Sequence, residues 1–351
     1  MQIKKRVCLL GVVALLLSAP ASVLAQNAID QLSGDLRFFF QEFGKDIVPN
    51  LQTASVMNHE LGSAQLGDFP RMYFSLSTGA TVDLRGGLEF TKQEFSDNYN
   101  NFGLFNNLFE EIGLTNEDTR EITDNYLPIP SMRAGFGVGL TQGWELSVQA
   151  GVVPQAATAF ALGFIDSDDN DDGFDASGIR GGITTVGTRL RKVLVEGERG
   201  VPAISAGVGY VFSNVELRVP LDGISVSTGG ADGDDLNLEG SLDFLVKTHS
   251  FGFDVRTSRR FLRVFYPFVG LSSYYQFTDY TAGVTDFGGT VGGSTLQRTV
   301  EPASRQSFQN FNTVINTGFD MKLGVLNLFL HGNYALETRA PGAIAGMRLQ
   351  F

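Results

Sequence analysis

The sequence predicts an all-β fold, an antiparallel transmembrane β-barrel of about 10–14 strands with an N-terminal amphipathic helix and a helical outer loop. Three observations indicate this fold class. Apolar and polar residues alternate over long segments, short turns alternate with long polar stretches, and the last strand ends on Phe351. The 351 residues include 42 glycines and 29 phenylalanines but are only 18% charged, which is atypical of a disordered chain.

Residues 1–25 have the pattern of a secretory signal peptide. Basic residues at 4–6 precede a short apolar core at 7–17, and Ala25 completes a small-residue cleavage pattern. Cys8 lies within this segment, so the predicted mature chain contains no cysteine. A disulfide scaffold and a multi-cysteine metal site are therefore excluded.

The charge balance limits the partners that the exported chain can have. The full sequence has a formal net charge of −12, which becomes more negative when Lys4, Lys5 and Arg6 leave with the signal peptide. A nucleic-acid partner is not expected because phosphates require a basic face. No segment after Ala25 approaches the roughly 18 consecutive apolar residues of a transmembrane helix. Two destinations remain, a soluble secreted β protein and a β-barrel in the lipid bilayer of an outer membrane.

Residues 26–68 are predicted to form a helical segment resembling a plug or hatch. Its apolar residues recur at helical spacing, and Pro49 is expected to end the helix. They are Ile29, Leu32, Leu36, Phe39, Phe40, Phe43 and Ile47. The phenylalanines Phe39, Phe40 and Phe43 would enter the barrel as a plug, or else pack on its rim or on the membrane surface. A plug is expected to need about twelve or more strands, since eight-stranded barrels are filled by side chains.

The barrel is predicted to occupy residues 69–351. Ten strands are expected near 71–84, 130–140, 144–154, 183–194, 203–219, 242–259, 262–280, 308–323, 325–336 and 342–351. Alternation alone also fits a soluble sandwich, but segments of about a dozen residues exceed the usual soluble strand. The apolar parity flips at Ser213-Asn214 and between Lys247 and Ser250, which indicates either bulges or extra turns that would raise the strand number.

The opposite face of the strands is polar and is expected to line the lumen, either as a solvated interior or as a polar conduit. Its residues are Asp83, Arg85, Arg133, Glu145, Gln149, Arg189, Arg191, Asp254, Arg256, Asp320, Lys322, His331 and Arg348.

The long loop at 85–129 carries an apolar stripe at helical spacing. Its predicted ligand-binding residues are Phe102, Phe105, Leu108, Phe109 and Ile112. These side chains would form a surface groove for hydrophobic small molecules, or the helices would simply fold over the barrel mouth and bury them.

A second outer loop contains the first half of a calcium-loop pattern. Asp168, Asn170 and Asp172 are the candidate Ca²⁺ ligands, but Ile179 stands where a bidentate Glu is expected. Such acidic loops are usually only solvated, and no other cofactor is expected.

No catalytic motif is found, and the chain is predicted not to be an enzyme. The three histidines His59, His249 and His331 lie outside any G-x-S-x-G or H-E-x-x-H setting.

The signal peptide, the amphipathic segment with Phe39, Phe40 and Phe43, and the barrel with its Phe-rich outer loop together resemble the FadL-like long-chain fatty-acid transporters and their spirochaete-like relatives. This resemblance in layout implies passive uptake of hydrophobic molecules such as fatty acids past a displaceable hatch. It also implies that the outer-membrane assembly machinery reads Phe351. The alternative is a structural or surface-interaction barrel, such as an adhesin or a simple porin.

Overall fold

The computed structural model describes the following parts of the chain. They are residues 37–57 (without 39, 42 and 46), 62, 64, 71–83, 127–153, 180–197, 201–220, 225–227, 235–261, 264–291, 294–297 and 304–351. Among these residues, no helix is both long and apolar enough to cross a membrane.

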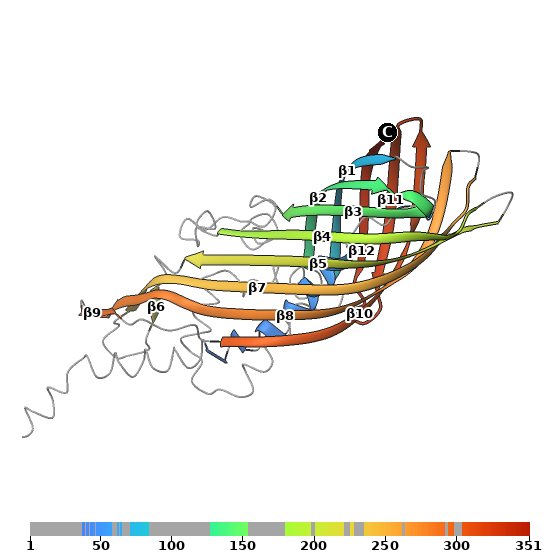
Figure 1. Cartoon of the computed structure of the whole chain (residues 1–351). Helices are drawn as coiled ribbons and strands as arrows, with labels where there is room; N and C mark the ends of the chain where they lie inside the picture. The colour runs from blue at the N-terminus through green and yellow to red at the C-terminus, as the bar shows by residue number, and fades with distance from the viewer. Residues whose placement is uncertain are drawn as a thin grey trace, which may run out of the picture.

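The described strands form an antiparallel sheet that closes on itself (Figure 1). They are β1 (Met72–Asp83), β2 (Leu127–Gly139), β3 (Trp144–Val153), β4 (Arg180–Val195), β5 (Ala203–Pro220), β6 (Ser225–Ser227), β7 (Asp235–Ser258), β8 (Phe265–Val291), β9 (Ser294–Gln297), β10 (Ser304–Leu323), β11 (Leu326–Ala335) and β12 (Pro341–Gln350). The ring order is β7-β5-β4-β3-β2-β1-β12-β11-β10-β8, closed by pairing of β7 with β8. This is a ten-stranded barrel, within the predicted range, and the short β6 and β9 only extend it.

The two ends of the barrel differ in their connections. At one end, called here the turn end, a 3-10 turn at Thr141–Gly143 joins β2 to β3, and β10 passes into β11 between Leu323 and Leu326. Strand β1 also begins there, and Met72 exchanges backbone hydrogen bonds of 3.1 and 2.9 Å with Phe351. The opposite end, called the loop end, carries the long predicted loops. Short periplasmic turns and long outer loops are typical of outer-membrane barrels.

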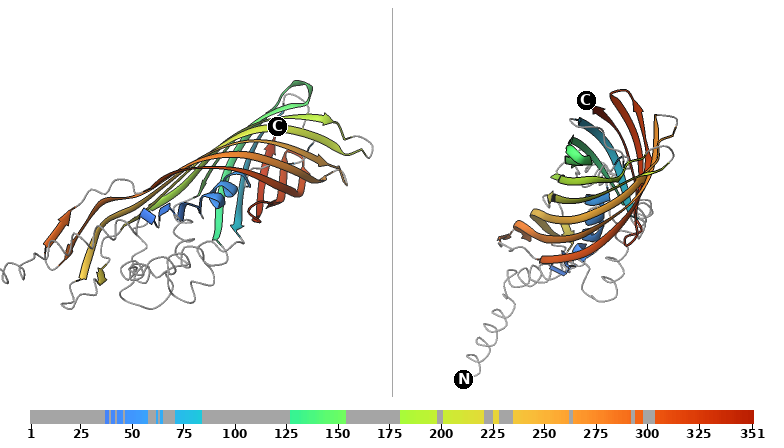
Figure 2. Two further views of the ribbon diagram at one scale, coloured as in Figure 1. Left: turned by 90° about the horizontal axis from the view of Figure 1, so that it is seen from below. Right: turned by 45° about the vertical axis from the view of Figure 1, so that its right-hand side comes forward.

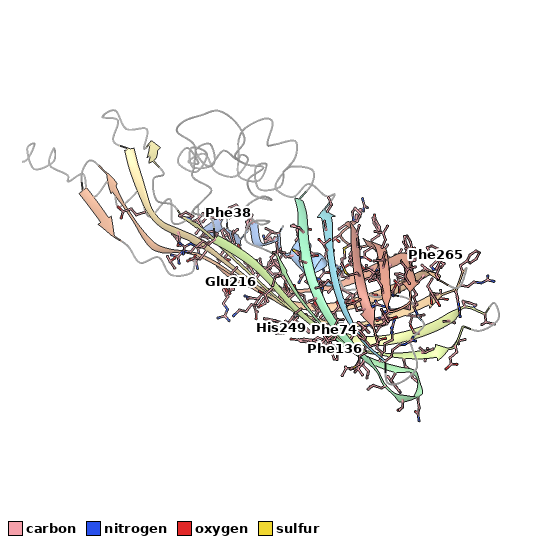
Figure 3. The ribbon with its side chains drawn as sticks, turned by 90° about the horizontal axis from the view of Figure 1, so that it is seen from above. Phe38, Phe74, Phe136, Glu216, His249 and Phe265 are labelled. Atoms are coloured by element: carbon pink, nitrogen blue, oxygen red, sulfur yellow. The ribbon has the colours of Figure 1, made fainter. Side chains whose placement is uncertain are left out.

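Side chains alternate between a lipid-type outer face and a polar inner face. In β3 the burial strictly alternates, with Leu146 and Val148 exposed while Glu145 and Gln149 are buried. Phe74 and Phe136 contact each other on the outer surface, with ring centroids 5.1 Å apart (Figure 3). A soluble protein would bury these residues, so the outward apolar face identifies a transmembrane barrel.

Four neighbouring strands reach far past the apolar band. β5, β7, β8 and β10 have 18, 24, 27 and 20 residues, whereas β11 and β12 have 10 each. A tilted membrane strand needs only about 9–11 residues. These strands therefore form a wall that projects beyond the membrane at the loop end (Figure 1). We call this part, residues 214–220, 235–247, 279–291 and 304–309, the projecting wall.

The projecting wall explains the parity flips in the sequence, and both sequence-based interpretations of them were wrong. The pairing of β5 with β7 is continuous from Ala203 to Pro220, without a bulge at 213–214 or an extra turn. Within the membrane band Val208 faces outward, but further along the same face Glu216 does (Figure 3). The apolar side turns inward instead, where Phe244 and Val246 of β7 are buried. The strand continues, and only its outer surroundings change from lipid to water.

An N-terminal helix lies on the concave side of the sheet (Figure 2). Its backbone is helical at every described position from 37 to 57, so the expectation that Pro49 ends the helix was wrong. A proline inside a helix costs about 3 kcal/mol, but residues 50–57 are all buried and this packing offsets the cost. We call the described residues 37–57, 62 and 64 the inner segment.

Candidate functional site in the barrel interior

The inner segment contacts opposite walls of the barrel at one level. Gln276 of β8 donates a hydrogen bond to the backbone oxygen of Gln52 at 2.9 Å. Arg133 of β2 donates to the backbone oxygen of Ser55 at 3.2 Å. Since β2 and β8 lie five strands apart in a ring of ten, the helix between them crosses the lumen interior. The view that ten strands leave too little room for a helix does not describe this barrel, because small side chains such as Ser250 and Ser272 line the wall here.

Further strand side chains bind backbone oxygens of the inner segment. Asn333 of β11 donates to Met57 at 2.5 Å, Arg256 of β7 donates to Gly62 at 3.0 Å, and Gln306 of β10 donates to Gln41 at 3.3 Å. The last four carbonyl groups of a helix have no partner within it. Polar residues of the wall therefore bond to the carbonyl groups of Ser55 and Met57, in the last described turn of the helix.

Side chains of the inner segment also bond to the wall. Gln52 donates to the hydroxyl of Thr278 at 2.7 Å, and Asn312 donates to the hydroxyl of Thr53 at 2.8 Å. Both Gln52 and Thr53 are buried. Because buried polar groups are costly unless paired, this polar stretch at 52–53 fits the lumen and not a lipid surface.

The apolar residues of the inner segment pack against the projecting wall at one end and against a buried cluster of strand residues at the other. Phe40 and Phe43 contact Phe244 of β7, with ring centroids 5.4 and 5.2 Å apart. Val56 and Met57 belong to a buried cluster with Tyr274, Val314, Ala335 and Ala340. At Gly44 a Cβ atom would lie only 2.5 Å from a ring carbon of Tyr280, so the helix approaches β8 closely there.

Charged side chains on the inner faces of several strands form ion pairs in the lumen. Glu145 is paired with Arg191 at 2.5 Å, and Asp320 contacts His331 at 3.1 Å and Arg348 at 3.9 Å. Asp254 is paired with both Arg189 and Arg256. These ion pairs form three groups, which link β3 with β4, β4 with β7, and β10 with β11 and β12.

The described lumen carries more cations than carboxylates. Arg133, Arg191, Arg256 and Arg348 are buried and Arg189 nearly so, against the buried carboxylates Glu145, Asp254 and Asp320. Arg133 makes no ion pair with the described residues, and its Nε atom has no hydrogen-bond partner. A buried charge without a counter-ion is unusual, so the interior provides an environment that favours an anion.

Arg133 also lines a cleft between the helix and strands β2 to β5. The cleft is narrow and, with the helix in place, has room for little more than a water molecule. Its lining is mostly apolar, with Leu51, Ala54, Ile129, Val153, Ile183 and Val215 beside Ser55, Thr185, Ser213 and Arg133. The cleft thus combines an apolar surface with one buried cation.

The structure describes only some of the residues that the sequence singled out. The polar inward residues from Arg133 to Arg348 do face the interior, as predicted, although the side chains of Asp83 and Arg85 lie outside the described residues. Of the predicted plug residues, Phe40 and Phe43 are described and Phe39 is not. The loop residues Phe102, Phe105, Leu108, Phe109 and Ile112, and the calcium candidates Asp168, Asn170 and Asp172, also lie outside the described residues, so these sites stay predictions.

Sequence reasoning missed the residues that hold the helix. Gln276, Asn312 and Asn333 occupy inward positions of strands, where an amide is unremarkable in a polar lumen. The only available signal was the polar run Asn50 to Ser55, which directly follows the Phe-rich stripe and needs buried partners.

Solved structures with a similar arrangement of strands are outer-membrane β-barrels. The outer membrane protease OmpT from Escherichia coli has a TM-score of 0.37 at 9% identity, with 82% of this chain and 99% of that chain covered. The translocator domain of the autotransporter NalP from Neisseria meningitidis has a TM-score of 0.34 at 7% identity, covering 88% and 96%. The KdgM porin in complex with disordered oligogalacturonate has a TM-score of 0.27 at 9% identity, covering 63% and 92%. No family model and no curated protein matches this sequence.

The closed ring and its outward apolar belt show by themselves that the protein is a transmembrane β-barrel of the outer-membrane type. The comparisons do not distinguish a FadL-like type, and signal-peptide cleavage near Ala25 stays a prediction. The prediction that the chain is not an enzyme was wrong, because the absence of local motifs on which it rested does not exclude catalysis. A protease is among the similar barrels, and residues that assemble in space leave no local motif in the sequence.

Proposed function

We propose that this chain is an outer-membrane conduit for small molecules that its own N-terminal segment keeps closed. The observation that supports the proposal is the placement of the helix between Gln276 of β8 and Arg133 of β2, on opposite sides of the ring. A helix about 10–12 Å across with side chains leaves little open lumen in a barrel of this size. Removal of the helix would leave a polar channel, since strand residues facing it include Thr278, Asn312 and Asn333.

The excess of buried arginines favours an anionic solute. We extend the proposal to small carboxylates with an apolar body, of which fatty acids are the example predicted from the loop stripe. The carboxylate suits Arg133, which has no ion pair among the described residues, and the apolar body suits the wall surface formed by Ile129 and Ile183 once the helix moves aside. The outer face of the barrel would then contact the lipid bilayer, and its interior would bind such solutes.

The decisive experiment removes residues 37–57 and measures single-channel conductance in planar lipid bilayers. The full-length protein is expected to give mostly closed traces, and the deletion variant is expected to give frequent conductance steps. Heat-modifiable migration in a gel reports that the deleted barrel still folds. A folded deletion variant with the same conductance as the full chain would contradict the proposal.

A second measurement tests the anion preference in the same deletion background. In a salt gradient, the reversal potential is expected to indicate selectivity for anions. Arg133→Gln is expected to reduce this anion selectivity. Arg218→Gln is the matched control, because Arg218 lies on the projecting wall with 55% of its side chain exposed. Equal effects of the two substitutions would count against an anion-attracting lumen.

The projecting wall supports a second candidate, a surface-interaction barrel. Its outer face presents Asn214, Glu216 and Arg218 at the loop end, and a wall this long is not needed to span lipid. Cells that express the full-length protein would then attach to a surface more strongly than cells without it. The plug deletion would not change that attachment, whereas it would change conductance.

A further inference from the structure

The inner segment has a defined direction inside the barrel, which follows from the order of its contacts along strand β7. β7 starts at the loop end at Asp235 and finishes at the turn end at Ser258. Phe40 and Phe43 contact Phe244, Gly62 accepts a hydrogen bond from Arg256, and Ala64 donates to the hydroxyl of Ser258 at 3.0 Å. The inner segment therefore runs alongside β7, from the loop end towards the turn end.

Two other strands give the same direction. β8 runs from the turn end to the loop end, and its contacts pass backwards along it, with Tyr280 beside Gly44 and then Gln276 beside Gln52. β10 runs the opposite way, and Gln306 bonds to Gln41 before Asn312 bonds to Thr53. Three strands thus place residues 40–44 within the projecting wall.

The length of this path exceeds the membrane. The 14 residues from Phe244 to Ser258 span about 46 Å along the strand at roughly 3.3 Å per residue. At the roughly 35–45° tilt of such strands this is about 33–38 Å along the barrel axis, against about 25 Å for the apolar band. In Figure 3, Phe38 and Phe265 lie towards opposite sides of the molecule. β1 starts at the turn end, so the described inner segment runs through the lumen towards the end where the barrel begins.

We propose that the N-terminal end of the inner segment is exposed on the outer surface of the cell, and that the chain passes inward through its own lumen to reach β1. Turn ends face the periplasm in outer-membrane barrels and loop ends face outward. The segment that fills the lumen is therefore reached from the environment at Arg37 and from the periplasm near Ala64. A molecule that displaces the helix by binding its N-terminal end, near Arg37, must act from outside the cell.

Cysteine labelling tests this topology directly, because the predicted mature chain lacks cysteine. Arg37→Cys is placed at an exposed position of the inner segment, and full-length protein is expressed in intact cells. Arg305→Cys, exposed on β10 of the projecting wall, is the outer control, and Thr141→Cys, exposed in the β2–β3 turn, is the periplasmic control. The probe is a membrane-impermeant maleimide coupled to polyethylene glycol.

The cysteines at positions 37 and 305 are expected to react in intact cells, and the one at 141 only after the outer membrane is permeabilised. Labelling of position 37 only after permeabilisation would overturn the proposal, as would no labelling in either condition. Heat-modifiable migration confirms that each variant is folded. The result does not depend on conductance, so a conduit that proves closed in every condition leaves this topology testable.

Discussion

Arg133 of β2 donates a hydrogen bond at 3.2 Å to the backbone oxygen of Ser55, in the last turn of the inner helix. This contact joins the wall of the barrel to the segment that fills it. The guanidinium lies towards the C-terminal side of the described helix, where a cation is favourable. Arg133 thus holds the helix and is a buried cation with no ion pair among the described residues.

We expect Arg133→Gln to loosen the inner helix without unfolding the barrel. A lost hydrogen bond to a buried carbonyl costs about 1–3 kcal/mol, which corresponds to a roughly five- to hundredfold rise in the open population. The number of conductance steps per minute in planar bilayers measures it. Arg218→Gln is the control, and a similar rise in both variants would show that the contact with Ser55 is unimportant.

The amide donors give an independent test of how the helix is held. The double substitution Gln276→Ala with Asn333→Ala removes the donors to the backbone oxygens of Gln52 and Met57 and is expected to open the barrel more often than Arg133→Gln. Asn316→Ala is the matched control, since Asn316 is equally buried but bonds only to Ser272 and Val314. Hydrogen exchange of residues 50–57 should increase in the double variant and should stay unchanged in Asn316→Ala. Unchanged exchange would mean that apolar packing suffices.

A pair of substitutions on one face of β5 tests where the membrane ends. Val208 is 58% exposed within the apolar belt, and Glu216 lies eight residues further on the same face of the projecting wall. Val208→Arg is expected to destabilise the barrel by about 2–4 kcal/mol, whereas Glu216→Arg should have little effect. Urea unfolding in lipid vesicles measures the free energy. Equal losses would place both positions in lipid.

The loop stripe remains a prediction from the sequence and can be tested separately. Phe105→Ser with Phe109→Ser is expected to weaken binding of a fluorescent fatty acid several-fold if the loop captures hydrophobic molecules. Phe74→Ser, on the lipid-facing surface, serves as the control for a general loss of phenylalanine. Binding that survives the loop substitutions would restrict any apolar ligand to the interior cleft.

The strand positions and their faces could be predicted because alternation is a local property. Each residue of β3 shows its environment by its own polarity, and the ends of β3 agree with the prediction to one residue. The inward placement of Glu145 and Gln149 follows from the same rule. The pairing of Asp254 with Arg189 could not be predicted, because it depends on the registers that bring β4, β5 and β7 together.

By itself the sequence determined that this chain forms a membrane barrel with a polar interior, because the polarity of each residue indicates whether it faces lipid or the lumen. Only the tertiary structure decided what fills that interior and where the membrane ends. A helix finds space according to the summed volume of side chains such as Ser250 and Ser272 on facing strands, and no single segment encodes that sum. Beyond Ser213-Asn214 the apolar side of the strand faces inward. Only the tertiary structure explains this change, because it shows the helix that packs on the inner side of the projecting wall.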